Sequence, residues 1–323
     1  MPPSSTKPTR SLTLDTGATA RVWIGDCRVQ LPKIPEVQEQ SVDLVFADPP
    51  FNWNRDYNKH ETPNTKSNKV WDDSAMSSEE YKRFTYDWID LCISALKPTG
   101  AIWVNIPDDW AAEIVVHLKT RELTMINWCI WHYRFGQNTK SRFINSKVHA
   151  LYFAKDPNNR TWNPDPILEE SDRRAIYADA RTESKRDGMP AGLRVPMDVW
   201  YGKHLGRIQG NNKERRPQHD NQLPETYLHR VIASTSNEGD TILDPFLGSG
   251  TTAVVATAMN RHFIGTEFSK DNAKTAMERI KIGPIRDLTA ARGASTAIAP
   301  KRTQTTPAPP KPQSKPRQKL KNS

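Results

Sequence analysis

The chain has 323 residues, and its 46 Lys and Arg outnumber its 37 Asp and Glu, which gives a formal net charge of +9. Only 36% of the residues are hydrophobic and no apolar run approaches the roughly 18 residues of a membrane span, so a transmembrane protein is excluded. Three scattered cysteines, Cys27, Cys92 and Cys129, are too few for a disulfide framework or a cysteine-based zinc site, so we expect no metal and a reducing, intracellular compartment.

The positive charge is placed unevenly along the chain. Residues 284–323 carry nine basic residues and one acidic residue, and residues 134–220 carry 17 basic and 11 acidic residues. Residues 11–133 and 221–283 are both net acidic. Residues 284–323 also contain seven prolines and little apolar content after Leu288, so they cannot bury enough surface to offset their chain entropy, and we expect a disordered tail.

Short apolar strands and amphipathic helices alternate in the first part of the chain. Residues 20–24 and 42–46 are rich in Val and Ile and predict buried strands, each ending in a polar loop. Ser77 and Glu80 form a capping box in front of apolar residues at helical spacing, which predicts a helix that stops before Gly100.

The alternation continues and then lapses. Residues 101–105, 125–131 and 150–154 predict strands, with a helix near 109–119, which is the pattern of a largely parallel sheet. Polar, Arg-rich sequence over 155–221 interrupts it, so we interpret the basic segment largely as an insertion in an α/β domain. The elements that follow are a helix over 224–234, a strand over 241–243, a helix ending at Met259, a strand over 262–266 and a helix from Asp271.

Two loops carry residues suited to chemistry, and the first is Asp48-Pro49-Pro50-Phe51, directly after the strand predicted over 42–46. Ligands bind at the carboxyl ends of strands in such sheets. Two prolines fix the backbone and remove two amide donors, so their carbonyls can only accept hydrogen bonds. A carboxylate, a rigid run of acceptors and an aromatic ring together suit a planar group bearing NH2. The tetrapeptide alone fits a Pro-rich turn capped by Asp equally well.

The second loop joins the strand over 241–243 to the next helix. Its glycines permit close backbone approach, and the helix N-terminus favours a negative group such as a carboxylate. A weak dinucleotide pattern is also present, but Asp-Pro-Phe separates strand from glycine and the first loop would have no role, so a dehydrogenase is disfavoured. Glu267 closes the following strand, where it could bind ribose hydroxyls or simply be solvated. The loop reads Asp244, Pro245, Phe246, Leu247, Gly248, Ser249, Gly250, Thr251 and Thr252.

DPPF followed much later by DPFLGSGTT resembles the β-class DNA amino-methyltransferases, which use S-adenosylmethionine, and the resemblance covers roughly residues 20–282. It implies an α/β fold with a doubly wound, mostly parallel sheet, the Rossmann-like methyltransferase fold, with an inserted target-recognition segment. The expected domains are a flexible N-terminus (1–15), a catalytic half (16–155), a target-recognition insertion (156–220), a cofactor-binding half (221–283) and a disordered basic tail (284–323).

The resemblance also implies roles for the first loop. The target base would be flipped out of the duplex because an in-stack amino group cannot meet the methyl donor in line. Phe51 would stack on that base, although an aromatic residue here could also be core. Asp48 and the Pro49 carbonyl would accept the amino hydrogens, within a rigid loop completed by Pro50. Asp48 would take up the proton lost after transfer, and no covalent intermediate is required.

The expected cofactor, S-adenosylmethionine, is assigned to the second loop by the same resemblance. Residues 244–252 would hold its methionine part and Glu267 its ribose. Asp26 would lie near cofactor and base, or serve as a turn residue. His219 and Gln222 match a region that contacts the amino acid end of the cofactor in the family, although the Lys-Pro pair that often follows this Gln is Leu-Pro here.

The choice of target atom depends on the first motif residue and on the cysteines. Methylation of cytosine C5 needs a cysteine nucleophile, usually preceded by Pro, and no cysteine here follows a Pro. Asp48 in first position favours adenine N6 over cytosine N4 by the habit of the family. Cytosine N4 methylation is the nearest alternative, followed by RNA methylation and a nucleic-acid-binding protein without catalysis.

The basic segment is expected to contact nucleic acid, since Lys and Arg bind phosphates and bidentate Arg reads guanine. A solvated basic face is the alternative for any single residue. Double-stranded DNA is the expected partner in the cytoplasm of a bacterium, or of the host of a phage that encodes the protein. A cognate restriction enzyme and a homodimer stay open as partners, and no membrane is expected. The candidate DNA-binding residues are Arg134, Lys140, Arg142, Lys147, Arg215 and Arg216.

Overall fold

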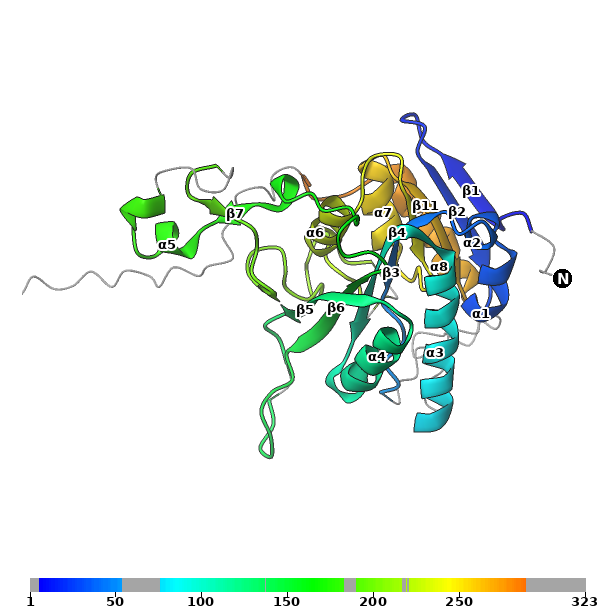
Figure 1. The fold of residues 1–323 in the computed structure, drawn as a ribbon, viewed down its shortest axis with the longest axis horizontal. Coiled ribbons are helices and arrows are strands. Elements are labelled where there is room, and N and C mark those ends of the chain that lie inside the picture. Colours follow the sequence, from blue (N-terminus) through cyan, green and yellow to red (C-terminus); the bar gives the residue numbers. More distant parts are fainter. Residues whose placement is uncertain are drawn as a thin grey trace, which may run out of the picture.

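A nine-stranded mixed sheet forms the centre of the computed structural model (Figure 1), which describes residues 6–53, 76–136, 138–182, 190–216, 219 and 221–288. The strand order is β1-β2-β11-β10-β3-β4-β6-β5-β9. The strands are β1 (Arg10–Thr13), β2 (Thr19–Ile24), β3 (Val42–Ala47), β4 (Leu96–Ile106), β5 (Thr124–His132), β6 (Lys147–Ala154), β9 (Val199–Trp200), β10 (Thr241–Asp244) and β11 (His262–Glu267).

The central strands of the sheet run in the same direction, so their carboxyl ends lie together. β2, β11, β10, β3 and β4 pair in parallel, so their carboxyl ends meet at one edge of the sheet. β6 is antiparallel to both β4 and β5, which departs from the largely parallel rhythm of the sequence. The described residues between β5 and β6 form no helix, and such a connection suits an antiparallel pair, whereas parallel neighbours need a crossover.

Helices pack on the sheet, and none of those described is long and apolar enough to cross a membrane. The predicted capping box is present: the Ser77 side chain accepts from the Glu80 amide, and the Glu80 carboxylate accepts from the Ser77 amide at 2.8 Å. The α-helices are α1 (Cys27–Gln30), α2 (Pro35–Gln38), α3 (Ser78–Ala95), α4 (Asp108–Thr120), α5 (Asp172–Ala175), α6 (Glu225–Thr235), α7 (Thr251–Ala258) and α8 (Lys270–Ile282).

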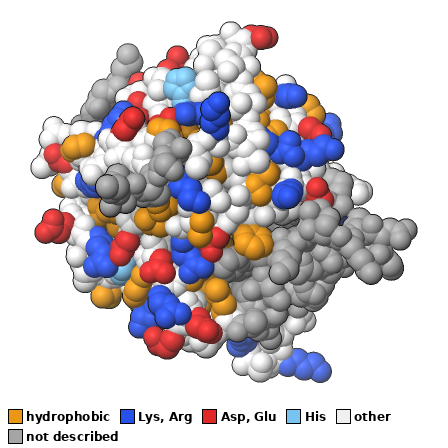
Figure 2. Space-filling model, turned by 90° about the vertical axis from the view of Figure 1, so that its right-hand side faces the viewer, with side chains coloured by type: hydrophobic (Ala, Val, Ile, Leu, Met, Phe, Trp, Pro, Cys, Tyr) orange, Lys and Arg blue, Asp and Glu red, His pale blue; other side chains and the backbone are white. Residues whose placement is uncertain are grey.

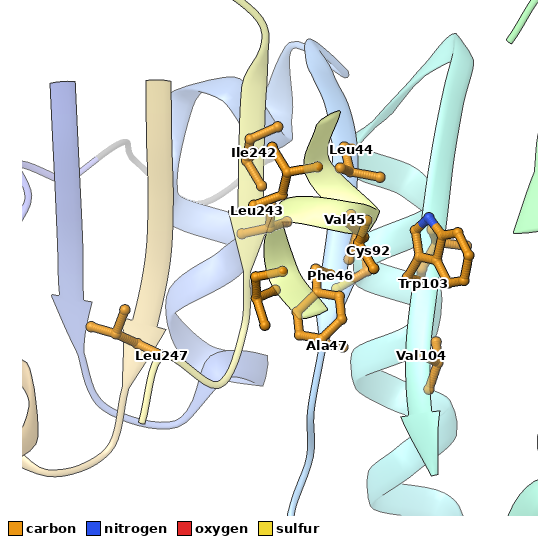
Figure 3. Packing of buried hydrophobic residues seen from close by; sticks show 14 of the residues in the cluster. Leu44, Val45, Phe46, Ala47, Cys92, Trp103, Val104, Ile242, Leu243 and Leu247 are labelled. Atoms are coloured by element: carbon orange, nitrogen blue, oxygen red, sulfur yellow. The ribbon is translucent and has the colours of Figure 1, made fainter. Parts of the chain in front are cut away.

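The core centres on β3 and β10, which lie side by side and are covered by helices (Figure 3). Leu44, Phe46, Ile242 and Leu243 are fully buried, because strands covered on both faces need apolar residues at successive positions. Trp103 of β4 is also buried and stacks on Tyr152 of β6, with ring centroids 4.4 Å apart. The strands that end in the two predicted loops are therefore held by the most buried part of the molecule.

The N-terminus is more ordered than the sequence predicted. A flexible segment was expected over residues 1–15, but β1 pairs with β2 from Arg10 to Thr13. The Thr6 carbonyl also accepts a hydrogen bond from Trp23 Nε1 at 3.1 Å. The described residues 6–15 thus include an edge strand, because β2 offers an open edge whose backbone groups β1 satisfies.

The insertion forms a separate lobe at one end of the molecule and also extends the main sheet (Figure 1). Within it, β7 (Glu169–Glu170) and β8 (Leu193–Arg194) form a two-stranded sheet. β9 leaves the lobe and pairs in parallel with β5, which places Trp200 beside Trp131. The insertion is thus anchored to the main sheet through an edge strand that sequence patterning did not predict.

The beginning of the predicted tail packs against the body. The backbone amides of Ile285 and Arg286 both donate to Glu225 at 2.8 Å, and Arg286 Nε donates to Glu214. Leu288 packs against the core. The described part of the chain ends there, so the rest of the predicted tail lies outside the described residues.

Candidate active site

Three acidic side chains meet at the carboxyl edge of the sheet. Asp48 follows β3, Asp244 ends β10 and Glu267 ends β11, and these three strands are neighbours. The charge of Asp244 contributes to raising the pKa of both Asp48 and Glu267, so the three carboxyls form one electrostatic cluster. The fold therefore joins the two loops, which are almost 200 residues apart in the sequence.

Asp48 is held in a state that can exchange a proton near neutral pH. Asn105 Nδ2 of β4 donates to Asp48 Oδ1 at 3.3 Å. Burial raises the pKa of Asp48 to about 7, against the lowering effect of this hydrogen bond and with a contribution from the Asp244 charge. A carboxyl with a pKa near the working pH can act as a general base or acid.

The rest of the first loop is rigid and aromatic. The Pro50 carbonyl accepts a hydrogen bond from the Tyr81 hydroxyl of α3 at 2.6 Å, which ties the loop to the helix. Phe51 is 8% exposed and meets Trp53 edge to face, with ring centroids 5.1 Å apart. Phe51 thus belongs to the core and also lines the pocket beside Asp48, and its stacking on a base stays a prediction.

A pocket opens beside Asp48 and encloses about 420 Å³, including its open mouth. Its walls are largely aromatic, with a carboxyl, amides and one guanidinium as polar groups, which suits a planar ligand that carries hydrogen-bond donors. The sequence reasoning missed most of these residues, because only the pairing of distant strands brings them together. The pocket is lined by Asp48, Phe51, Trp53, Trp131, Tyr133, Val148, Arg207, Asn221, Gln222 and Leu223.

The second loop requires its glycines. Gly250 is the N-cap of α7 with φ +80°, and a Cβ there would lie 2.7 Å from the Ala276 Cβ. Gly248 has φ +50° and donates its amide to Glu267 Oε2 at 2.8 Å. Among the described residues beyond its chain neighbours, a Cβ on Gly248 would meet only the Phe246 carbonyl within 4 Å, so these residues leave a cradle at this point. Both glycines adopt left-handed backbone conformations that other residues disfavour.

Asp244 and the rest of the loop are fixed by short local hydrogen bonds. Asp244 Oδ1 accepts from the Phe246 amide at 2.8 Å, and the Pro245 carbonyl accepts from the Thr266 hydroxyl at 2.6 Å. Burial raises the pKa of Asp244 to about 6, against a lowering hydrogen bond from Thr252. The carboxyl edge thus keeps an acidic group whose ionisation a cationic ligand would favour.

Glu267 braces the glycine loop. One oxygen accepts from Gly248 and the other from the Ser269 amide at 2.8 Å, with Asn272 Nδ2 at 3.4 Å. Burial raises the pKa of Glu267 to about 7, against the hydrogen bonds from Ser269 and Gly248. A carboxylate offers about four lone-pair sites, so these three donors leave acceptor capacity for a ribose hydroxyl.

Arg279 of α8 supports the loop from behind, a role that the sequence did not reveal. It is 4% exposed and donates from Nη1 to the Ser249 carbonyl at 2.6 Å and to the Thr251 hydroxyl at 3.1 Å. Nη2 lies 3.4 Å from Glu225 of α6. Arg279 lies 28 residues or more beyond the loop it holds, so no local pattern marked it.

Asp26 lies at the same edge, where Gly25 donates its amide to the Glu267 carbonyl at 2.8 Å. Its side chain caps α1 and pairs with Arg28 Nη2 at 2.7 Å. Although burial opposes the shift, hydrogen bonds from Arg28 lower the pKa of Asp26. The structure thus places Asp26 at the same edge as Glu267, where its side chain caps α1, a role that the sequence analysis did not consider.

Gln222 reaches the pocket but also has a structural role. Its Nε2 donates to the Glu214 carbonyl at 2.6 Å, and its Oε1 accepts from the Arg216 amide at 3.0 Å. These bonds connect the end of the insertion to the start of α6. Arg215 is exposed, and His219 is half-buried. Gln222 is therefore the member of this group that lines the pocket.

The other candidate DNA-binding residues lie on or beside the loop between β5 and β6, residues 133–146, here termed the β5–β6 loop. Arg134, Lys140 and Arg142 are exposed on it. Lys147, at the start of β6, pairs instead with the Asp108 carboxylate of α4. Because β5 runs parallel to β4, this loop leaves the sheet at the edge that holds Asp48.

Comparisons with known proteins identify the family. The model of the DNA methylase family, which covers N6 and N4 methyltransferases, matches residues 42–278. The type II methyltransferase M.HpaI of Haemophilus parainfluenzae is 30% identical over 79% of this chain and 73% of the relative. M.BamHI of Bacillus amyloliquefaciens is 32% identical over 81% of this chain and 57% of the relative. The DNA adenine methyltransferase YhdJ of Escherichia coli K12 is 30% identical over 80% and 81%.

Solved structures confirm the predicted fold. The M1.HpyAVI–SAM complex matches with a TM-score of 0.53 at 17% identity, over 80% of this chain and 98% of that one. The cytosine-N4-specific PvuII DNA methyltransferase matches with a TM-score of 0.54 at 14% identity, over 92% and 89%. The family match also confirms S-adenosylmethionine as the cofactor. The chain belongs to the β-class family of S-adenosylmethionine-dependent DNA amino-methyltransferases.

Proposed function

We propose that this enzyme methylates the N6 amino group of adenine in duplex DNA, after the base has been flipped into the pocket beside Asp48. The observation that carries the proposal is a pocket whose described walls include four aromatic rings and the buried carboxyl of Asp48, next to the Pro49-Pro50 turn. The similarity to the adenine-specific YhdJ supports adenine as the base. Extraction of the base is needed because its amino group is not accessible for in-line transfer inside the stack.

In this site the flipped base would lie against Phe51 and Trp53. Asp48 and the Pro49 carbonyl would each accept one amino hydrogen, which directs the nitrogen lone pair away from them. The Tyr81 hydroxyl already occupies the Pro50 carbonyl, so this second carbonyl holds the loop in place. After transfer, Asp48 takes up the amino proton, a role that suits its pKa of about 7. Alignment of this kind can contribute about 7 to 11 kcal/mol to catalysis.

S-adenosylmethionine supplies an electrophilic methyl group on a sulfonium when it is bound. Its ammonium and sulfonium charges and its ribose hydroxyls fit the buried acidic groups Asp244 and Glu267. Its carboxylate fits the N-terminus of α7, which the Gly248 cradle leaves approachable. Arg279 and Glu267 both hold this loop, through the Ser249 carbonyl and the Gly248 amide respectively.

The β5–β6 loop is the surface that we assign to duplex DNA. Tyr133 at the start of this loop and Val148 of β6, just after it, both line the pocket, so DNA that delivers a base there must pass close to the loop. Its exposed Arg134, Lys140 and Arg142 match the phosphate charge. The protein face around β1, α1 and α2 instead carries Lys and Arg interspersed with Asp and Glu (Figure 2).

The base assignment is tested by the product. Purified enzyme would be incubated with S-adenosylmethionine and unmethylated duplex DNA, and the DNA digested to nucleosides for mass spectrometry. We expect N6-methyladenine. A product containing N4-methylcytosine would contradict the assignment of adenine as the target base. Methylation of RNA in preference to DNA would contradict the assignment of duplex DNA as the substrate.

A further inference from the structure

A hydrogen-bonded chain of buried polar side chains leads to the carboxyl that faces the pocket. Asn105 of β4 and Tyr227 of α6 are both fully buried. The Tyr227 hydroxyl donates to Asn105 Oδ1 at 2.6 Å, and Asn105 Nδ2 donates to Asp48 Oδ1 at 3.3 Å. The three residues come from elements 57 and 122 residues apart in sequence, so this chain exists only because of the fold.

The geometry points to Asn105 and Tyr227 as positioning residues for Asp48, acting as a relay that fixes which oxygen of the carboxyl faces the target amine. The inference rests on the proposed function, because it assigns Asp48 as the group that accepts the amino hydrogen. It does not depend on whether the base is adenine or cytosine.

Asn105 needs the tyrosine to hold its orientation. An asparagine amide can present either its NH2 or its carbonyl oxygen in nearly the same space. A donor on Tyr227 requires the carbonyl on its own side, which directs the NH2 to Asp48. The reversed amide would place an oxygen against the Asp48 carboxylate and leave a buried donor unsatisfied, which is unfavourable.

Tyr227 is suited to remain a donor. Its ring contacts Phe46 of β3 at 6.1 Å, Trp131 of β5 at 5.3 Å and Trp200 of β9 at 5.3 Å, measured between ring centroids. Burial, followed by the charge of Asp48, raises the pKa of Tyr227 well above its ordinary value, so its hydroxyl keeps its proton. Packing against three strands thus fixes the position of the hydroxyl independently of the hydrogen bond.

The relay also sets the ionisation of Asp48. The Asn105 hydrogen bond lowers the pKa of Asp48, against the larger raising effect of burial. With Asn105 donating to Oδ1, Oδ2 is the oxygen directed to the amine. Loss of the relay should therefore misalign the acceptor and move the acidic limb of the pH–rate profile to higher pH.

Two variants test this with little change in shape. Tyr227→Phe keeps the ring packing and removes the hydroxyl, and Asn105→Asp keeps the volume and removes the NH2 donor. Tyr86→Phe is the matched control, because Tyr86 of α3 stacks on His117 with ring centroids 3.8 Å apart and is not part of the relay. Single-turnover methyl transfer would be measured from pH 5.5 to 9 with saturating cofactor and DNA.

We expect Tyr227→Phe to slow transfer about 3- to 10-fold, the effect of one hydrogen bond, and Asn105→Asp to slow it about 100-fold. Both should shift the acidic limb upward, and Tyr86→Phe should leave rate and profile unchanged. Unchanged profiles in both relay variants would overturn the inference. Equal slowing at every pH, without a shift, would also overturn it, because that would indicate a general structural effect.

A second measurement keeps this result separate from the proposed function. The Asp48 carboxyl would be titrated by carbon NMR in full-length protein labelled at its carboxylates, with Asp48→Asn identifying the signal. We expect a higher midpoint in both relay variants than in the wild type. Equal midpoints would overturn the relay even in a protein without activity, whereas shifted midpoints without methyl transfer to DNA would overturn the proposed function alone.

Discussion

At the residue scale, Asp48, Asp244 and Glu267 are three neighbouring carboxyls whose burial disfavours their ionised forms. Burial is the first cause in each case and raises their pKa values to about 7, 6 and 7. The native protein without cofactor therefore holds protons on groups that would be ionised in water. A bound cationic cofactor would lower the pKa values of these carboxyls, because a nearby positive charge favours the ionised carboxylate.

The pH dependence of stability follows from these pKa values. Because the folded-state pKa values exceed the unfolded ones, the native state binds more protons between about pH 4 and 7, and the contribution of these groups to stability falls as pH rises through their folded pKa values. We expect the free energy of unfolding of Glu267→Gln, from urea denaturation without cofactor, to fall less between pH 5.5 and 8 than that of the wild type. Glu278→Gln, at an exposed site on α8, should behave as the wild type.

Cofactor affinity should change in the opposite direction. In the proposed site, Asp244 and Glu267 would pair with S-adenosylmethionine in their ionised forms, so its dissociation constant, measured by calorimetry, should fall between pH 5.5 and 8. An affinity that is constant over this range would show that these carboxyls do not ionise with binding.

At the element scale, the positions of the two loops could be predicted from the sequence, because each motif is contiguous and follows a recognisable strand. Asp48, Phe51 and Gly250 were found in this way. Asn105 and Arg279 could not be, since their roles depend on pairing between β3 and β4 and on packing of α8 behind the loop. The edge strand β9 was missed because two residues give no periodic pattern.

Gly250 offers a test of the cofactor loop. Gly250→Ala would combine a left-handed backbone with a Cβ 2.7 Å from that of Ala276. We expect a loss of about 2 to 3 kcal/mol in stability and at least 10-fold weaker cofactor binding, by thermal denaturation and calorimetry. Gly239→Ala is the control, because Gly239 has φ +83° and no described atom lies within 4 Å of the added Cβ, so this change should cost only about 1 kcal/mol.

The β5–β6 loop offers a test of DNA contact. Phe143 at this loop is 97% exposed beside Arg142, so it can stack on bases that a flipped nucleotide leaves unstacked. We expect Phe143→Ala to weaken duplex binding about 5- to 100-fold and single-stranded binding less, by fluorescence anisotropy. Ile282→Ala, which alters a residue 75% exposed on α8, is the control. Equal DNA binding by Phe143→Ala and the wild type would contradict the prediction that Phe143 of this loop contacts DNA.

At the scale of the whole molecule, positive and negative charges belong to different parts of the chain. The sheet that carries the acidic site is framed by a basic insertion and followed by a basic tail, so the net charge of +9 does not describe the catalytic body. Ile285 and Arg286, which composition assigned to the tail, donate hydrogen bonds to Glu225 and Glu214, contacts that composition alone could not predict.

Removal of residues 289–323 tests the role of the tail. These residues carry eight Lys and Arg and no acidic residue. Because each phosphate contact contributes about −0.9 to the slope of log affinity against log salt, the truncated enzyme should show a shallower slope, by at most about 7. The methylated sequences should stay the same by sequencing of modified DNA. A changed sequence preference would make the tail part of the recognition apparatus.

The most direct measurement is transfer of a labelled methyl group from S-adenosylmethionine to duplex DNA by the wild type and by Asp48→Ala, with cofactor binding measured in parallel. We predict label in the DNA with the wild type and at least a 100-fold lower rate in Asp48→Ala, with the cofactor still bound. Full activity of Asp48→Ala would contradict the proposed role of Asp48 as the acceptor of the amino proton.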